Sequence, residues 1–166
     1  MAALRASGRD VRQLHGIIGA DPIGELAAQG SLSKPLTLLY DEMADCAAWA
    51  TANTPELRTV MVRSDVFSRG GANDIQETAY TIAAAVVYLR AMLKRGLSID
   101  DAARQIMFCF SMGANFFLQV AKLRVECHHE VVDTGYDAMA HGGEALVIVS
   151  HQWVLLAGVS QDRKST

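Results

Sequence analysis

Cysteine, proline and aromatic residues are scarce in this chain: of 166 residues, three are cysteine, three are proline, and 7% are Phe, Trp or Tyr. Cys46, Cys109 and Cys127 are odd in number and far apart, and the sequence contains no Cys-x-x-Cys pair. This spacing does not support a disulfide framework. It predicts reduced, mostly buried thiols, which are typical of cytoplasmic proteins.

An excess of charge of one sign and a long apolar run are also missing. The net charge is -3 and the pI is about 5.9, so no basic field would attract nucleic acid or an anionic membrane. The longest apolar runs, residues 83–89 and 145–149, are too short to span a bilayer. The first residues lack the apolar segment of a signal peptide. We therefore expect neither nucleic-acid nor membrane binding.

Hydrophobic periodicity is the strongest signal in the sequence, since 51% of the residues are hydrophobic. Helices separate apolar strands, an order that predicts an α/β fold with a parallel sheet. The strands 145–150 and 153–159 are expected in a tail without sustained periodicity. The other expected strands cover residues 57–62 and 105–111, and the expected helices cover residues 2–15, 23–29, 35–51, 74–95, a short segment after Ser98, and 113–127.

The expected helix at residues 74–95 has the clearest pattern. Its apolar positions recur at steps of four and three and form one stripe along the helix. Asp74 and Glu77 resemble a capping box at its start, and Gly96 predicts its end. The stripe consists of Ile75, Ala79, Ile82, Val86, Leu89 and Leu93.

Polar residues stand where the expected strands meet their helices, the edge at which parallel α/β proteins bind ligands. In an extended strand running to residue 65, Arg63 and Asp65 would share one face and Ser64 the other. Ser111 is the last residue of the next expected strand, and Asn115 follows that strand. A binding site and a solvated loop are equally consistent with this pattern. The five histidines lack metal-ligand spacing, so no metal site is predicted.

Four sequence segments carry a resemblance to a known family. They are Gly19-Ala-Asp-Pro-Ile-Gly-Glu-Leu-Ala, Leu38-Leu-Tyr-Asp-Glu-Met-Ala, Arg69-Gly-Gly-Ala-Asn-Asp-Ile-Gln-Glu-Thr-Ala-Tyr-Thr-Ile and Asn115-Phe-Phe-Leu-Gln-Val-Ala-Lys-Leu-Arg. Over about residues 14–124 the chain resembles the cobalamin-dependent methylmalonyl-CoA mutases, most of all their small-subunit branch. The resemblance implies part of a (β/α)8 TIM-type barrel that encloses the acyl-CoA. The residues at the strand ends, Arg63, Ser64, Asp65, Ser111 and Asn115, are therefore the substrate-binding candidates.

The same resemblance implies that residues needed for catalysis are missing from this chain. The family's catalytic chain carries a Tyr-His pair over the substrate, and Asp65 and Val66 stand at those positions here. Neither side chain offers the hydrogen bonds of a phenol and an imidazole. The family's cobalt-binding Asp-x-His-x-x-Gly motif is also absent from the sequence. We therefore expect adenosylcobalamin only in a parent complex, bound by a catalytic large subunit that pairs with this chain as a heterodimer.

The resemblance ends near residue 124, which predicts a barrel portion at residues 1–124 and an atypical, possibly frameshifted tail at 125–166. The parent reaction it implies is the radical isomerisation of methylmalonyl-CoA to succinyl-CoA. Alone the chain is expected to be inactive, with unpaired sheet edges. The alternatives are a stabilising interaction subunit and a disrupted gene product. The sequence does not identify which acyl-CoA the complex uses.

Overall fold

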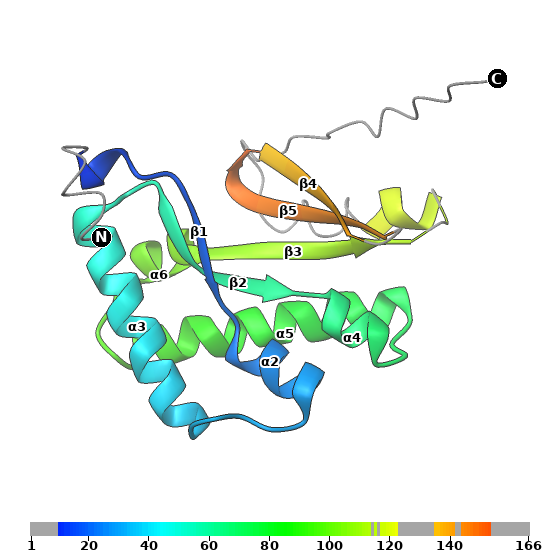
Figure 1. Ribbon diagram of the computed structural model, residues 1–166, viewed down its shortest axis with the longest axis horizontal. Coiled ribbons are helices and arrows are strands. Elements are labelled where there is room, and N and C mark those ends of the chain that lie inside the picture. The colour runs from blue at the N-terminus through cyan, green and yellow to red at the C-terminus, as the bar shows by residue number, and fades with distance from the viewer. Residues whose placement is uncertain (1–9, 114, 116, 123–134, 142–143, 154–166) are drawn as a thin grey trace.

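The chain folds around one mixed β-sheet in the computed structural model, which describes residues 10–113, 115, 117–122, 135–141 and 144–153. The sheet has 5 strands in the order β1-β2-β3-β5-β4 (Figure 1). The first three strands in this order are parallel, and β5 pairs antiparallel with both β3 and β4. The strands are β1 (Gly16–Ala20), β2 (Leu57–Arg63), β3 (Ile106–Met112), β4 (Gly135–His141) and β5 (Glu144–Trp153).

Helices connect the parallel strands, as the sequence predicted. A 3-10 turn precedes β1, two helices join β1 to β2, and three join β2 to β3. The α/β class and the parallel strands with flanking helices are therefore confirmed. The elements are η1 (Val11–Gln13), α2 (Pro22–Gln29), α3 (Leu36–Asn53), α4 (Asp65–Arg69), α5 (Asp74–Leu93) and α6 (Ile99–Gln105), and residues 117–122 are also helical.

Local capping chemistry sets the helix boundaries. Asp21 accepts a hydrogen bond from Gly24 N at 3.1 Å, and α2 ends at Gly30, whose φ of 72° favours glycine. The expected capping box on α5 was placed one residue too late. Asn73 and Gln76 form it, because Asn73 Oδ1 accepts from Gln76 N while Gln76 Oε1 accepts from Asn73 N.

The main core lies between the helices and one face of the sheet. Val60 and Val62 of β2 pack in one cluster with residues of α3, α5 and α6. On the opposite face, Met107 and Cys109 form a smaller cluster with Ile17 and Met61. Figure 1 shows α3 and α5 on the same side of the parallel strands. The helix-facing cluster comprises Met43, Ala44, Ala47, Val60, Val62, Ala84, Ala85, Tyr88, Ala91, Met92 and Ala102.

The apolar stripe predicted on α5 does not form its buried face. Ile75 is 79% exposed, Val86 38% and Leu93 36%. The buried face instead carries Glu77, Thr81, Ala84, Ala85, Tyr88, Ala91 and Met92. Alanines let α5 approach the sheet closely, and the buried polar groups have hydrogen-bond partners there.

The tail contributes structure that the sequence indicated only in part. The strand expected at 145–150 is confirmed within β5, whereas β4 and the short α4 were not expected. β5 pairs with β3 from Phe108↔Val149 to Met112↔Ala145, so the edge of β3 is covered rather than unpaired. Residues 117–122, within the helix expected at 113–127, are helical, whereas residues 123–127, most of the helix expected at 2–15 and most of the strand expected at 153–159 lie outside the described residues. Within the described part, no helix is long and apolar enough to cross a bilayer.

Candidate functional site

The carboxyl ends of β2 and β3 lie side by side because the strands pair in parallel register. Arg63 is opposite Cys109 in the ladder. One residue further, Ser64 N donates to Cys109 O at 2.9 Å, and Ser111 N donates to Ser64 Oγ at 2.8 Å. The polar residues expected at these two strand ends are therefore brought together.

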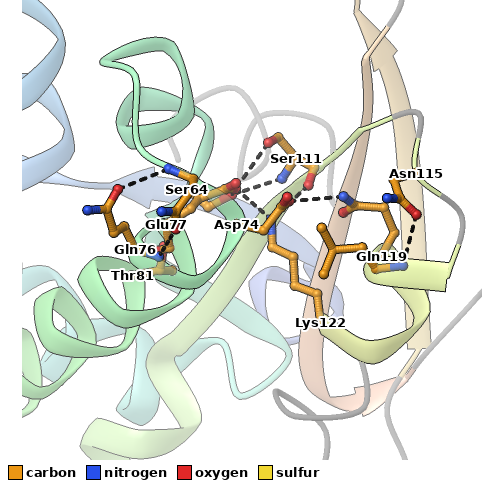
Figure 2. A network of polar contacts seen from close by, with 11 residues as sticks. Ser64, Asp74, Gln76, Glu77, Thr81, Ser111, Asn115, Gln119 and Lys122 are labelled. Carbon is orange, nitrogen blue, oxygen red and sulfur yellow. Dashed lines mark hydrogen bonds and ion pairs between the residues drawn. The ribbon is translucent and has the colours of Figure 1, made fainter.

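Glu77, in the first turn of α5, is the centre of a buried network at this edge (Figure 2). Its Oε1 accepts hydrogen bonds from the hydroxyls of Ser64 and Ser111, the latter at 3.0 Å. Lys122 Nζ lies 2.8 Å from the same oxygen, and the Glu77 and Lys122 side chains are only 3% and 2% exposed. A buried carboxylate is tolerated when it is paired and hydrogen-bonded in this way.

Lys122 and Gln119 extend the network to the helix at 117–122. Lys122 Nζ also donates to Ser111 O at 3.1 Å, and Gln119 Nε2 donates to Asp74 Oδ1 at 3.0 Å. Gly113 leaves room for this amide, since a Cβ there would lie 3.3 Å from Gln119 Nε2. Gln119 Oε1 is buried and has no hydrogen-bond partner within the described part of the chain. Among the buried side-chain polar atoms of the described residues, it alone lacks a hydrogen-bond partner.

Asp65 lies in a second polar group on the other side of the β2 end. Its carboxylate receives two hydrogen bonds from Arg63, Nε to Oδ1 at 3.0 Å and Nη2 to Oδ2 at 2.8 Å. Arg69, one turn along α4, lies 3.4 Å from Oδ2. The hydrogen bond from Arg63 to Asp65 raises the pKa of the guanidinium. Asp65 is therefore a buried anion held by two arginines, not a free group facing a ligand.

Arg63 and Asp65 meet, as predicted, but not through strand alternation. β2 ends at Arg63, Ser64 has helical dihedrals (φ -87°, ψ -28°), and Asp65 is the first residue of α4. The turn into α4 brings the Asp65 carboxylate back onto the guanidinium. The strand interpretation was wrong for residues 64 and 65 because a five-residue helix has too little periodicity to be recognised.

Asp21 and Tyr88 are site residues that sequence reasoning missed. Tyr88 OH donates to Asp21 Oδ1 at 2.6 Å and accepts from Ile23 N at 2.7 Å. Asp21 Oδ2 accepts from Arg63 N at 3.2 Å, which ties the start of α2 to the end of β2. Burial raises the pKa of Asp21, and burial together with the nearby Asp21 charge raises that of Tyr88. The Asp21-Pro22 pair indicated a helix cap, but nothing local pointed to Tyr88.

The remaining candidates differ in accessibility. Asn115 is exposed, and its Oδ1 accepts from Leu118 N at 3.3 Å at the start of the helix at 117–122. Cys109 is buried, and burial raises the pKa of its thiol to about 12, so it is no nucleophile near neutral pH. Cys46 is a free, partly exposed thiol. Among the described residues, no cluster of His, Cys, Asp and Glu could hold a metal ion.

Comparison with known proteins identifies the family of this chain. A family model described as methylmalonyl-CoA mutase matches residues 1–151. The chain belongs to the methylmalonyl-CoA mutase family. It is 31% identical over 124 residues to the methylmalonyl-CoA mutase of Escherichia coli K12, covering 75% of this chain and 17% of that protein.

Subunits of both kinds occur among the relatives. The methylmalonyl-CoA mutase small subunit of Streptomyces virginiae is 34% identical over 67% of this chain and 17% of its own length. The probable large subunit of Mycobacterium tuberculosis H37Rv is 32% identical over 75% of this chain and 16% of its own length. The chain thus spans about a sixth of these relatives.

Asp65 and Val66, the residues predicted from the sequence to stand at the positions of the Tyr-His pair, are 2% and 7% exposed, and this correspondence stays a prediction. Ser64 and Ser111 are buried and bonded to Glu77, while Arg63 and Asn115 reach the surface. Their role in substrate binding stays a prediction. So does the domain boundary near residue 124, although the family match continues to residue 151 and includes β4.

Proposed function

We propose that this chain is a portion of a methylmalonyl-CoA mutase barrel of the small-subunit type, without catalytic activity of its own. The observation that carries the proposal is the burial and the side-chain chemistry of Asp65 and Val66. Asp65 is buried between Arg63 and Arg69, and Val66 offers only an aliphatic side chain. Neither residue can present a hydrogen-bond donor to an acyl-CoA as a Tyr-His pair would.

The arrangement of the parallel strands supports a barrel portion. β1, β2 and β3 are neighbours in chain order, and the helices between them share one core cluster with β2. A β/α barrel has sequential strands and helices on its outer face only, whereas a doubly wound sheet carries helices on both faces. The one-sided packing therefore favours the barrel.

The pairing of β5 supports a boundary between residues 1–124 and 125–166. A barrel would continue from β3 with another parallel strand, but β5 runs antiparallel to β3. We infer that the tail departs from the barrel at this point. A frameshift and a true second segment are distinguished by reading the nucleotides after the Arg124 codon in the other frames.

Cobalamin does not fit the described residues. At the strand ends the charged side chains of Glu77, Lys122, Arg63 and Asp65 are engaged with one another, and no imidazole lies among them. Adenosylcobalamin, which supplies the radical, would belong to the large subunit of a cytoplasmic complex. Acyl-CoA would contact this chain through the accessible Arg63 and Asn115, with Ser64, Asp65 and Ser111 holding the edge in place.

The partner proposal is tested by mixing the purified chain with a catalytic large subunit and measuring co-elution and conversion of methylmalonyl-CoA to succinyl-CoA. We expect a heterodimer, no turnover by this chain alone, and turnover by the large subunit. Turnover by the isolated chain with adenosylcobalamin would overturn the inactivity. Aggregation without co-elution would support a disrupted gene product. Co-elution without any contact between this chain and the acyl-CoA would support a purely stabilising subunit.

The acyl-CoA contact has its own test. Arg63→Ala should weaken binding of methylmalonyl-CoA to the heterodimer, measured by calorimetry. Arg69→Ala is the matched control, because Arg69 also pairs with Asp65 but is the more exposed partner, on α4. Equal affinities of the two variants and the unmodified complex would remove Arg63 from the proposed site.

A further inference from the structure

The sheet has apolar strands in its middle and irregular strands at its edges. β3 reads Ile-Met-Phe-Cys-Phe-Ser-Met, and β5 contains the apolar run at 145–149. In the order β1-β2-β3-β5-β4 these two strands lie side by side (Figure 1). β3 carries no charged residue and no proline. Such a strand, if it stood at the edge of a sheet, would be a template for strands of other chains.

The two strands that do stand at the edges are poor templates. β1 pairs with β2 through a register that shifts between Ile17 and Ala20, and Gly19 between them has a φ of 82°. β4 has a register shift next to Gly135 and carries the charged residue Asp137. Bulges, glycines and charges protect sheet edges from pairing with other chains. Strands β4 and β5 together therefore replace the apolar edge of β3 with a protected edge.

The peptide groups of β3 show which of its hydrogen-bonding groups β5 covers. Cys109 O accepts from Ser64 N at the end of β2, so the peptide groups of Cys109 face β2. Successive residues of a strand direct their N–H and C=O groups to opposite edges, so those of Phe108 and Phe110 face β5. Without β5 these groups would form an open edge. Their partners in the ladder are Val149 for Phe108 and Val147 for Phe110.

We propose that β4 and β5 form an edge cap, which prevents a second copy of this chain from adding a strand to β3. Val147 lies in the centre of the cap, opposite Phe110 of β3 on one side and Ala138 of β4 on the other. Since the peptide groups of Val147 face β3, those of Ala138 face the outer edge of β4. The edge cap follows from strand pairing alone, so it does not depend on the proposed mutase function.

Proline substitution in the full chain tests the edge cap. Val147→Pro removes an N–H that faces β3, and proline is not tolerated within a central strand. The β3 edge should open, and size-exclusion chromatography with light scattering should show dimers or larger species. Ala138→Pro is the matched control, because Ala138 lies directly opposite Val147 but its N–H faces outward, where proline is tolerated. This variant should keep the mass of the unmodified chain.

Hydrogen exchange of the unmodified chain tests the pairing itself. The amides of Phe108 and Phe110, which face β5, should exchange at least about a hundredfold more slowly than unstructured amides. The amide of Cys109 is the internal reference, because it faces β2. Slow exchange at Cys109 with fast exchange at Phe108 and Phe110 would show that β5 does not cover the edge, and would overturn the proposal.

The folding of the proline variants decides how their masses are interpreted. Circular dichroism and slow exchange at Cys109 show that a variant keeps its sheet. A folded Val147→Pro with the mass of the unmodified chain, or equal association of Val147→Pro and Ala138→Pro, would overturn the edge cap. If Val147→Pro unfolds, Ala145→Pro replaces it with the same expectation and the same overturning results, because Ala145 pairs with Met112 at the end of the ladder.

Discussion

The two faces of α5 reverse the usual relation between hydrophobicity and burial. The inner face buries Glu77, Thr81 and Tyr88, each with a hydrogen-bond partner, while the outer face exposes Ile75 and Leu93. Buried polar groups cost little when they are paired, and the alanines between them allow close approach to the sheet. The comparison shows that the polar network and the shape of the packing surface, not the apolar stripe, orient this helix.

The largest effect is expected on the inner face, from Glu77→Ala. Removing the carboxylate leaves the Lys122 ammonium buried without its partner and frees the hydroxyls of Ser64 and Ser111. Breaking a buried ion pair in this way typically costs about 3–5 kcal/mol of unfolding free energy. Urea denaturation followed by circular dichroism measures the loss.

The control for that variant is the double replacement Glu77→Leu with Lys122→Met. It removes both charges, so no buried charge is left alone, and it should recover a large part of the lost stability. A loss below about 1 kcal/mol for Glu77→Ala would show that the network contributes little. The inner face would then owe its burial to the alanines alone.

A smaller loss is expected from Tyr88→Phe, further along the inner face. The hydroxyl both donates to Asp21 and accepts from Ile23 N, so its removal leaves one partly buried donor and one carboxylate oxygen short of a partner. Such losses cost about 1–3 kcal/mol. Thermal unfolding measures the loss. Tyr80→Phe is the matched control, because Tyr80 lies on the exposed side of α5, and the thermal midpoint of this variant should be unchanged.

The sequence was sufficient to predict the fold class and most helices and strands, because local signals set them. Asp21-Pro22 with Gly30 marks α2, and the break after Asn53 together with the apolar run from Leu57 marks β2. The orientation of α5 could not be predicted, since it depends on partners distant in sequence. β4 and α4 were missed because neither has a recognisable periodicity. Pairing with β5 defines β4, and α4 is a single short turn of helix.

The candidate site was predictable in place but not in detail. Strand ends of a parallel sheet locate Ser64 and Ser111 together, as expected. Glu77 and Lys122 were missed as site residues because each stands in an amphipathic helical segment, where a charged residue usually faces solvent. Nothing in the local sequence around Glu77 or Lys122 indicates that the two side chains will meet in the core.

Replacing Asp21 by asparagine should change how stability depends on pH. Because burial raises the pKa of Asp21 above its ordinary value of 3.8, the folded state holds the proton more tightly than the unfolded state. This contribution to stability is complete below the unfolded pKa and is lost as pH rises through the folded pKa. Asp21→Asn keeps the cap on Gly24 N and cannot titrate.

The stability difference, unmodified chain minus Asp21→Asn, should therefore fall as pH rises from about 3 to 7. Urea midpoints at several pH values measure it. Glu25→Gln serves as the control, because Glu25 is an exposed carboxylate in the first turn of the same helix. A difference that rises with pH would mean that the hydrogen bonds to Asp21 outweigh its desolvation.

The smallest effect belongs to the outer face, in Ile75→Ala. Ile75 is 79% exposed, so truncation removes little buried surface and should change the unfolding free energy by less than about 0.5 kcal/mol. Alanine also favours the helix slightly more than isoleucine does. A loss comparable to that of Tyr88→Phe would mean that another part of the chain covers this face, and that the two faces of α5 differ less than their exposures indicate.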